Sequence, residues 1–370
     1  MKAIRIHNHG DANSLSLDDI NMPPKADDEI IVKVKATALN HLDIWVRNGL
    51  PGIPIPLPLI MGSDASGKVV DVGLKVKDFK VGDKVVIQPG TFNDSYNDLQ
   101  VGKENFSKSY GILGETENGV QAEFVSLPER NLHLMSEHLT YEESASMQLV
   151  FMTSYQMLVK RAHLKDSDII MIYGGSSGVG SAAIQIAKDI GATVIATAGN
   201  KKKENHAYSM GADFVVSHYE NDSFISQIKD ITNNKMCNVV FEHIGLNTWN
   251  QSMRCLAKGG RLVTCGSTTG ANIKIDLRHL FMKQQTILGS TMAGMESFNE
   301  VMTKIKNNIY LGKVSRIEPS LQAAFIDFGR ERHGFLSFND IQSDYYQIPK
   351  ADLEKIKEEE EKAREELSKQ

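Results

Sequence analysis

The sequence predicts an α/β protein in which a β-rich N-terminal domain is followed by a doubly wound parallel sheet. Short alternating apolar segments bounded by turn residues occupy the first ~125 residues, which predicts the β-rich domain. From Asp168 to about Leu288, strand-like apolar runs alternate with helix-like stretches, which predicts a parallel sheet with helices on both faces. A glycine-rich turn, Gly174–Gly180, connects the first of these strands to its helix.

The N-terminal part is predicted to consist of strands and loops. Residues Ile30–Ala36 alternate apolar and polar side chains, as expected for a strand with one buried face. Gly67–Gly73 and Gly82–Ile87 contain short strands bounded by turn residues. The proline-rich stretch Leu50–Pro58 predicts a loop, because proline interrupts helices and lacks the N–H that a central strand needs.

The second part is predicted to contain parallel strands with intervening helices. The strands are Ile169–Tyr173, Thr193–Ala198, Phe214–Val216, Asn238–Glu242, Arg261–Cys265 and Thr286–Leu288. The longest helices are predicted at Gly180–Ile190 and Asn247–Leu256, and Gly191 and Gly211 are expected to end helices. A helical stretch running from Tyr141 toward Lys160 precedes this part, and a helix over residues 295–306 ends it.

The turn after Tyr173 has the features of a phosphate-binding loop. Its glycines allow the backbone to approach a pyrophosphate, and the N-terminus of the following helix offers free N–H groups and the positive end of the helix dipole. Glycine-rich turns also occur as ordinary tight turns. The strand before this turn and the helix after it supply the context that a dinucleotide site requires, so the sequence predicts dinucleotide binding.

Composition narrows the class of protein. The chain has 370 residues, of which 41% are hydrophobic and 24% charged, as in ordinary globular proteins. A net charge of -5 and a pI of about 6.1 argue against a protein that coats nucleic acid. We expect no membrane span and no signal peptide, and a cytoplasmic location by default. Cys237, Cys255 and Cys265 have no paired spacing, which argues against disulfides and a zinc knuckle.

Five motifs, in this order and spacing, resemble the medium-chain dehydrogenase/reductase family of alcohol dehydrogenases and quinone reductases. They are Ala38–Asp43, Pro58–Gly67, Val81–Val85, the turn Gly175–Gly180, and Gly259–Val263. The resemblance covers residues 1 to about 306. It implies a GroES-like catalytic domain at residues 1–150, a Rossmann NADP-binding domain at 151–306 and an active site in the cleft between them. Such proteins are often homo-oligomers, so we expect a homo-oligomer here.

Many family members carry zinc, but this chain lacks the usual ligands. Asn40 stands at the position of the first cysteine, and Gly62-Ser63-Asp64 stands where relatives have Gly-His-Glu. The third ligand position falls near Leu149, and the structural zinc lobe falls in Gly90–Gln100, which has no cysteine. Zinc needs roughly three or four thiolate, imidazole or carboxylate ligands. The sequence therefore predicts a zinc-free enzyme similar to the quinone oxidoreductase branch.

Without zinc as a Lewis acid, the implied chemistry is hydride transfer from reduced nicotinamide to a quinone, an activated double bond or a carbonyl. The resemblance places Asn40 near the nicotinamide, although asparagine also suits a turn at a strand end. His41, with Asp43 close by, is a candidate proton or hydrogen-bond donor to substrate, although a lone histidine is often a surface or packing residue. Trp45 stands where quinone reductases often have tyrosine, so their proton relay is not carried over.

Cofactor contacts are predicted along the Rossmann domain. By resemblance they are Thr153 at the nicotinamide, Gly175, Ser177, Gly178, Val179 and Gly180 at the phosphate turn, and His243, Ile244, Gly266 and Ser267 at later strand ends. Ser177 replaces the usual middle glycine.

The second strand ends at Ala198 without the carboxylate of NAD enzymes, and Asn200, Lys201 and Lys202 follow. Clustered lysines favour the extra phosphate of NADP, and a solvated lysine run at a helix start is the alternative.

The C-terminal part changes character. Residues 307–349 resemble the start of the S1 RNA-binding domain of ribonuclease E/G, most clearly in the stretch Gly312–Leu336, with about three of the five strands that an OB-type barrel needs. The resemblance implies RNA contacts at Phe325, His333, Phe335, Arg316, Arg330 and Arg332. Because the usual return to the catalytic domain is missing, the sequence predicts two joined gene fragments meeting near Lys306 to Asn308. Residues 350–370 predict a charged helical or disordered tail.

These observations leave several function hypotheses. The leading one is an NADPH-dependent, zinc-free oxidoreductase acting on a quinone, an enone, an enoyl thioester or an aldehyde. The alternatives are an activity like that of alcohol dehydrogenases, RNA binding through the S1-like segment, and a nucleotide-binding protein that is catalytically inactive. Reduction assays distinguish an active enzyme from an inactive one, and an RNA gel shift tests the RNA hypothesis.

Overall fold

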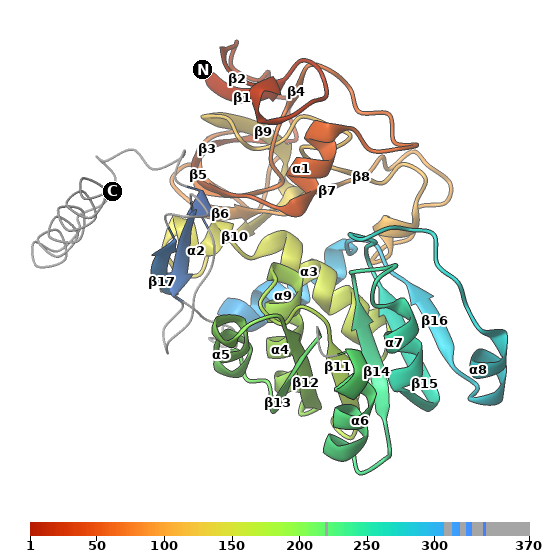
Figure 1. Cartoon of the computed structure of the whole chain (residues 1–370). Helices are drawn as coiled ribbons and strands as arrows, with labels where there is room; N and C mark the ends of the chain where they lie inside the picture. The colour runs from red at the N-terminus through yellow and green to blue at the C-terminus, as the bar shows by residue number, and fades with distance from the viewer. Residues whose placement is uncertain (219–220, 307–312, 319–322, 328–335, 338–370) are drawn as a thin grey trace, which may run out of the picture.

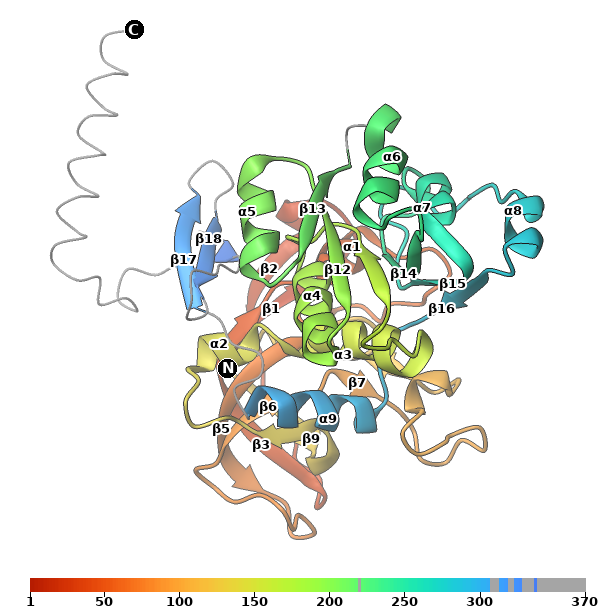
Figure 2. The same cartoon turned by 90° about the horizontal axis from the view of Figure 1, so that it is seen from below.

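A computed structural model of the chain describes residues 1–218 and 221–306, together with three short strands between residues 313 and 337. Figure 1 shows the strands β1 to β10 of the N-terminal domain on one side of the molecule and the parallel sheet of the second domain on the other. Helices α3 and α9 lie between the two domains (Figures 1 and 2). The predicted α/β architecture is confirmed.

Antiparallel strands build the N-terminal domain. Its largest sheet has the order β10-β6-β5-β3-β9. These strands are β10 (Leu132–Leu134), β6 (Lys84–Ile87), β5 (Asp64–Val72), β3 (Glu29–Ala38) and β9 (Phe124–Pro128). Smaller sheets are formed by β1 (Lys2–Ile6) with β2 (Leu15–Asp19) and β4 (Leu59–Ile60), and by β7 (Gly90–Thr91) with β8 (Gly111–Ile112). Alternate residues such as Ile30, Val32 and Val69 are fully buried, as the alternating pattern predicted.

Helices in this part connect the strands and lead into the second domain. They are α1 (His41–Asn48), α2 (Tyr141–Ala145) and α3 (Gln148–Tyr155), with short 3₁₀ turns at Ala12–Ser14, Glu104–Phe106 and Glu129–Asn131 and a π-helical turn at Gln156–Arg161. The prediction of one helical stretch from Tyr141 to Lys160 is wrong in part. The stretch breaks at Ser146, whose hydroxyl donates to the carbonyl of Glu143 at the end of α2.

The second domain contains the predicted parallel sheet, in the order β13-β12-β11-β14-β15-β16. Its strands are β11 (Ile169–Ile172), β12 (Thr193–Ala198), β13 (Phe214–Ser217), β14 (Cys237–Glu242), β15 (Leu256–Thr264) and β16 (Thr286–Gly289). Every predicted strand is present. β15 begins earlier than predicted, because Leu256 already pairs with Cys237 across an irregularity in the ladder.

Helices cover both faces of this sheet. They are α4 (Gly178–Ile190), α5 (Lys201–Ser209), α6 (Asn221–Ile231), α7 (Trp249–Cys255) and α8 (Leu277–Met282). Ile170 and Ile172 share a core with α3 and α4, whereas Met171 and Tyr173 share one with α6 and α7. The prediction that Asn247–Leu256 is among the longest helices is wrong, because α6 and α9 are longer than α7. Gly191 and Gly211 have positive φ at helix ends, as predicted.

The last described helix, α9 (Met295–Lys306), contacts both domains and confirms the helix predicted at residues 295–306. Its buried residues Phe298, Val301, Met302 and Ile305 belong to the same core as Met135 and Leu139 of the N-terminal domain. The chain therefore comes back to the N-terminal domain after its last parallel strand. The sequence analysis expected no return to that domain, and for α9 this expectation is wrong. The predicted domain boundary at residue 150 falls within α3, which shares that core.

Three antiparallel strands follow: β17 (Lys313–Glu318), β18 (Ala323–Asp327) and β19 (Leu336–Ser337). They do not show an S1-type barrel, and RNA binding stays a prediction. The candidate RNA contacts His333, Phe335, Arg330 and Arg332 and the tail at residues 350–370 lie outside the described residues. The same is true of residues 307 and 308 at the predicted join.

Candidate active site

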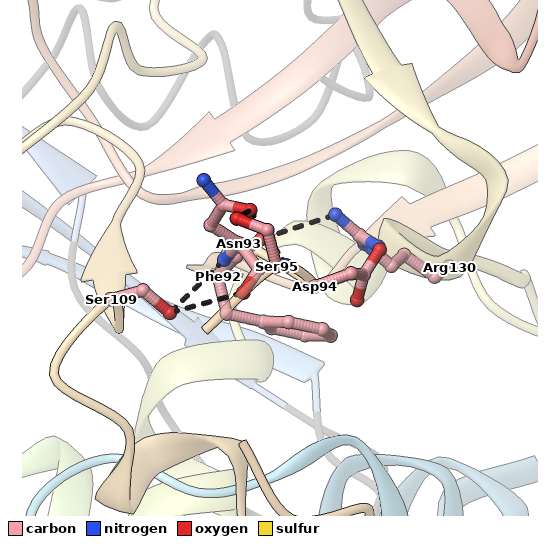
Figure 3. Close-up of polar contacts among 6 residues, drawn as sticks. All are labelled: Phe92, Asn93, Asp94, Ser95, Ser109 and Arg130. Carbon is pink, nitrogen blue, oxygen red and sulfur yellow. Dashed lines mark hydrogen bonds and ion pairs between the residues drawn. The ribbon is translucent and has the colours of Figure 1, made fainter. Parts of the chain in front are cut away.

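The segment Gly90–Gln100, where relatives have a structural zinc lobe, is held to neighbouring parts of the N-terminal domain by polar contacts (Figure 3). Arg130 forms an ion pair with Asp94 and donates to the carbonyl of Phe92 at 3.2 Å. The Arg130 guanidinium also lies 4.5 Å from the centre of the Phe92 ring. The backbone N–H of Asn93 donates to Ser109 Oγ at 3.1 Å, which connects the lobe to the segment that follows it.

The predicted phosphate turn has the geometry of a helix N-terminus. Ser177 is the N-cap of α4, and its Oγ accepts from the backbone N–H of Gly180 at 3.1 Å. A Cβ at Gly180 would lie 2.1 Å from the carbonyl oxygen of Gly174, so only glycine fits there. Serine in place of the usual middle glycine therefore caps the helix without strain. The first N–H groups of α4 remain available to an anion.

Helix α3 packs directly against this turn. A Cβ at Gly178 would lie 2.9 Å from Val150 Cγ1, so α3 and the start of α4 approach closely. Thr153, the predicted nicotinamide contact, lies one turn further along α3 and is 5% exposed. Its hydroxyl is 3.8 Å from Met292 Sδ. The structure thus places Thr153 in the core beside the turn, and its contact with nicotinamide stays a prediction.

His243 lies beside the same turn, just after the end of β14. Its Nε2 is 3.0 Å from the carbonyl oxygen of Tyr173. Because a carbonyl only accepts, Nε2 carries the proton and Nδ1 keeps its lone pair. Burial lowers the pKa of His243, which keeps the ring neutral. A Cβ at Gly174 would lie 3.3 Å from this ring, so the glycine makes room for the histidine.

A buried carboxylate organises the loop that begins with His243. Glu242 is fully buried, and its Oε1 accepts from the backbone N–H groups of Ile244 at 2.7 Å and Gly245 at 3.1 Å. Its Oε2 accepts from the hydroxyls of Thr248 at 3.0 Å and Ser252 at 2.5 Å. These bonds satisfy the carboxylate, and among the described ion pairs none includes Glu242.

The loops after β14 and β15 contact each other at the same edge of the sheet. Thr268 Oγ1 donates to the carbonyl of His243 at 3.1 Å, and Thr269 Oγ1 donates to that of Ile244 at 2.9 Å. A Cβ at Gly266 would lie 3.2 Å from the carbonyl oxygen of His243. The predicted residues His243, Ile244, Gly266 and Ser267 are therefore brought together, as expected for strand ends of a parallel sheet.

The residues predicted to select NADP follow β12. Asn200 caps α5, and its Oδ1 accepts from the backbone N–H of Lys203 at 2.9 Å. Lys201 Nζ lies 2.9 Å from Glu204 Oε1. The lysine run therefore begins a helix, and whether it binds a phosphate or is only solvated stays a prediction. This local structure does not conflict with phosphate binding. Burial, followed by the positive charge of Lys203, lowers the pKa of nearby His218.

The predicted catalytic residues of the N-terminal domain surround two buried carboxyl groups. Asp43 Oδ2 accepts from the backbone N–H of Asn40 at 2.7 Å at the start of α1, a helix that the sequence analysis missed. Asn40 Nδ2 donates to Asp64 Oδ2 at 3.0 Å. Burial raises the pKa of Asp43 to about 6 and that of Asp64 to about 7, and the neighbouring Asp43 charge contributes to the Asp64 shift.

His41 is the first residue of α1, on the N-terminal side of the site. It is exposed, and its ring centre lies 5.9 Å from that of Trp45 on the same helix. It is also close enough to His243 for its charge to lower the pKa of that residue. The structure thus brings His41 of the N-terminal domain near the phosphate-turn side of the sheet. Asn200, Lys201 and Lys202 lie apart from His41, beyond the end of β12.

Two buried carboxyl groups were missed as site residues. The sequence analysis considered Asp64 only as a zinc ligand, although its place in Gly62-Ser63-Asp64 marked it as part of a family motif. Glu242 directly precedes the predicted His243 and was treated as the last residue of a strand. Within residues 1–218 and 221–306, no three His, Cys, Asp or Glu side chains come together as a metal site would require.

Two family profiles match the chain. The profile described as alcohol dehydrogenase GroES-like domain matches residues 26–137, and the one described as zinc-binding dehydrogenase matches residues 178–307. Crotonyl-CoA carboxylase/reductase of Cereibacter sphaeroides is 33% identical over 324 residues, which are 80% of this chain and 75% of that protein. Quinone oxidoreductase 1 of Escherichia coli is 28% identical over 308 residues, which are 83% of this chain and 86% of that protein.

Solved structures show the same fold. The crystal structure of an NAD-dependent alcohol dehydrogenase matches with a TM-score of 0.81 and 36% identity, over 84% of this chain and 91% of that one. A crotonyl-CoA carboxylase/reductase, AntE, in complex with NADP matches with a TM-score of 0.79 and 24% identity, over 85% of this chain and 87% of that one. No helix in the described part of the chain is long and apolar enough to cross a membrane.

The raised pKa of Asp64 predicts a pH-dependent stability difference. A carboxyl whose pKa is about 7 when folded and near 3.8 when unfolded stabilises the fold at low pH and loses this contribution as pH rises through that window. The variant Asp64→Asn cannot titrate. We therefore expect its free energy of unfolding, relative to the parent, to improve steadily between pH 4 and pH 7 in urea titrations.

The control is Asp276→Asn, since the Arg278 hydrogen bond lowers the pKa of Asp276 to about 2. Its difference from the parent should stay constant above pH 5, where Asp276 is already ionised. A pH-independent difference for Asp64→Asn would contradict the raised pKa.

Proposed function

The chain belongs to the medium-chain dehydrogenase/reductase family, and from this we propose that it is a zinc-free, NADPH-dependent oxidoreductase. It transfers hydride to a quinone or to an activated double bond or carbonyl. Of its relatives, one is named for crotonyl-CoA and another for quinones. Both acceptors are conjugated, and conjugation spreads the charge that hydride addition develops.

One observation carries the proposal: residues of both domains come together beside a turn that fits a dinucleotide. His243 and Gly174 lie on the Rossmann side of this place, and His41 with Asn40 lies on the other. Ligands of parallel α/β sheets bind at the carboxyl ends of the strands, where this turn lies. A substrate held there would meet groups from both domains.

The residues fit the implied cofactor. Gly174 adopts a φ of 58°, and a side chain at Gly180 would collide with the backbone, so the turn forms a cradle that only glycines permit. The N–H groups at the start of α4 would hold the pyrophosphate, and Lys201 and Lys202 an added ribose phosphate. When bound, reduced nicotinamide supplies the hydride.

Asn40 and His41 are the proposed catalytic residues at the substrate. Exposed His41 would donate a proton or a hydrogen bond to the substrate oxygen, and the Asn40 amide would contact nicotinamide or substrate. Asp43 is proposed to hold Asn40 and His41 in place, since it is buried and accepts a hydrogen bond from the backbone N–H of Asn40. At the zinc positions of relatives this chain offers Asn40, Ser63 and Asp64, a poor donor set for zinc.

The proposed activity is tested by an assay of NADPH oxidation with a quinone, an enone and a saturated aldehyde as acceptors. We expect turnover with the two conjugated acceptors, a higher kcat/KM with NADPH than with NADH, and no loss of rate after dialysis against a chelator. Metal analysis of the same sample should find no stoichiometric zinc. Oxidation of simple alcohols without any reduction of conjugated acceptors would favour an activity like that of alcohol dehydrogenases. Binding of NADPH without turnover would indicate a catalytically inactive protein.

The cofactor prediction concerns the lysines after β12. Lys201→Gln and Lys202→Gln should each weaken NADPH binding roughly tenfold, since a hydrogen bond to a charged group contributes about 1.5 kcal/mol or more. Binding of NADH, measured beside it by fluorescence titration, should not change. Lys235→Gln is the control, because Lys235 precedes the amino end of β14, whereas Lys201 and Lys202 follow the carboxyl end of β12. Equal losses for both cofactors would exclude recognition of the added phosphate.

We also propose a homo-oligomer that assembles at β16. Among the described strands, β16 pairs only with β15, so its other edge offers unpaired N–H and C=O groups. Beside it in Figures 1 and 2, helix α8 carries Leu277, Phe281 and Met282, which are 65%, 67% and 68% exposed. A second copy meeting this face would cover both features.

The oligomer prediction is tested by sedimentation of the double variant Phe281→Asp/Met282→Asp. Two charges in a buried apolar contact should shift the protein toward monomer. Leu74→Asp, at a residue 92% exposed in the N-terminal domain, should leave the assembly unchanged. A parent protein that sediments as a monomer would refute the proposed interface.

A further inference from the structure

Asp64 joins the start of α1 to α3, the helix between the two domains, through hydrogen bonds. It is 1% exposed, at the first residue of β5. Its Oδ2 accepts from Asn40 Nδ2 at 3.0 Å, and its Oδ1 accepts from the backbone N–H of Leu149 at 3.0 Å. Among the described ion pairs none includes Asp64, so these two bonds and its buried surroundings define its position.

The bond to Asp64 determines how the Asn40 amide is turned. Above its pKa of about 7 Asp64 is ionised, and an ionised carboxylate accepts hydrogen bonds and donates none. In that state Asn40 must direct Nδ2 toward Asp64, as the 3.0 Å contact has it, which leaves Oδ1 and the second Nδ2 hydrogen for other partners. An amide with the opposite orientation would place an oxygen against a carboxylate oxygen and lose the bond.

The second bond relates Asn40 to the phosphate turn. Leu149 lies in the first turn of α3, next to Val150, and Val150 packs against Gly178 at the start of α4. A short series of direct contacts thus leads from the turn, through α3 and Asp64, to the Asn40 amide. A shift of Asp64 would change the distance between Asn40 and a nicotinamide whose phosphates the turn holds.

We propose that Asp64 is a positioning residue, which holds the Asn40 amide in one orientation toward the nicotinamide end of the site. This inference rests on the proposed function, because Asn40 acts there. Asp64 itself is too buried to touch substrate or cofactor. The competing explanation is that Asp64 only stabilises the N-terminus of α3, independently of Asn40.

A double-mutant cycle separates the two explanations. In Asp64→Asn the new side chain has the same shape, and its oxygen can still accept from the Leu149 N–H. Its NH₂ group then faces Asn40 and favours the reversed amide. We expect kcat/KM for NADPH-dependent reduction to fall about tenfold to a hundredfold, the range expected for a misoriented catalytic group. Asn40→Ala should cause a loss of similar size.

The decisive arm is Asn40→Ala/Asp64→Asn. If Asp64 acts through Asn40, its substitution has no further effect once the Asn40 amide is gone, and the double variant is as active as Asn40→Ala. If Asp64 only supports α3, the two losses multiply. The expected loss lies mainly in kcat, whereas a general loss of structure would also lower the midpoint of thermal unfolding and the affinity for NADPH.

Glu104→Gln is the matched control. Glu104 is 4% exposed in the same domain, and its oxygens accept from the backbone N–H groups of Gly102 at 2.7 Å and Met295 at 2.9 Å. It has no contact with Asn40 among the described bonds. Any effect of Glu104→Gln on activity should therefore multiply with that of Asn40→Ala.

If Asp64→Asn does not fold, the exchanged pair Asn40→Asp/Asp64→Asn tests the same contact. Its carboxylate at position 40 accepts from the amide at position 64, so the pair should regain the unfolding midpoint that Asp64→Asn loses. No recovery would overturn the inference. If the parent is active and the losses of Asn40→Ala and Asp64→Asn multiply in the double variant, the role of Asp64 is overturned and the proposed function stands. A parent that neither binds NADPH nor turns over would refute the proposed function as well.

Discussion

The burial of α3 between the two domains is the constraint on which the site depends. Phe151, Met152 and Tyr155 belong to one core that includes strands of the parallel sheet, α4 and α9. Because interiors are close-packed, this helix has little freedom to shift. Its position places Val150 on the phosphate turn and Leu149 on Asp64, so the apolar core also sets the distance between the groups proposed to bind the cofactor and those proposed to meet the substrate.

Buried carboxyl groups are the second shared feature of the site. Asp43, Asp64 and Glu242 are all desolvated, and each accepts hydrogen bonds from backbone or neutral side chains, although Asp43 Oδ1 is buried without a partner among the described residues. Such an arrangement costs free energy unless every bond is made. Each of these residues holds a segment that carries a predicted site residue: the start of α1, the Asn40 amide, and the loop after His243.

Much of the fold was predictable because strand and helix periodicity is local. β12 has the predicted bounds Thr193–Ala198, and all six parallel strands were expected. The break at Ser146 and the helix α1 were missed, because each depends on a side chain that bonds to nearby backbone rather than on apolar spacing. The phosphate turn was predictable from its glycines together with the strand before it and the helix after it, since positions 174 and 180 leave no room for, or strain, a side chain.

The sequence by itself determined the family, the dinucleotide turn and the poor match to a zinc site, because each depends on which residue types occur in order along the chain. Only the tertiary structure decided which of those residues meet. Asn40 and Asp64 are bonded although 24 positions apart, and Asp64 and Leu149 although 85 apart. Contacts over such separations follow from the packing of two domains around α3, and no local pattern encodes the orientation of a single amide within that packing.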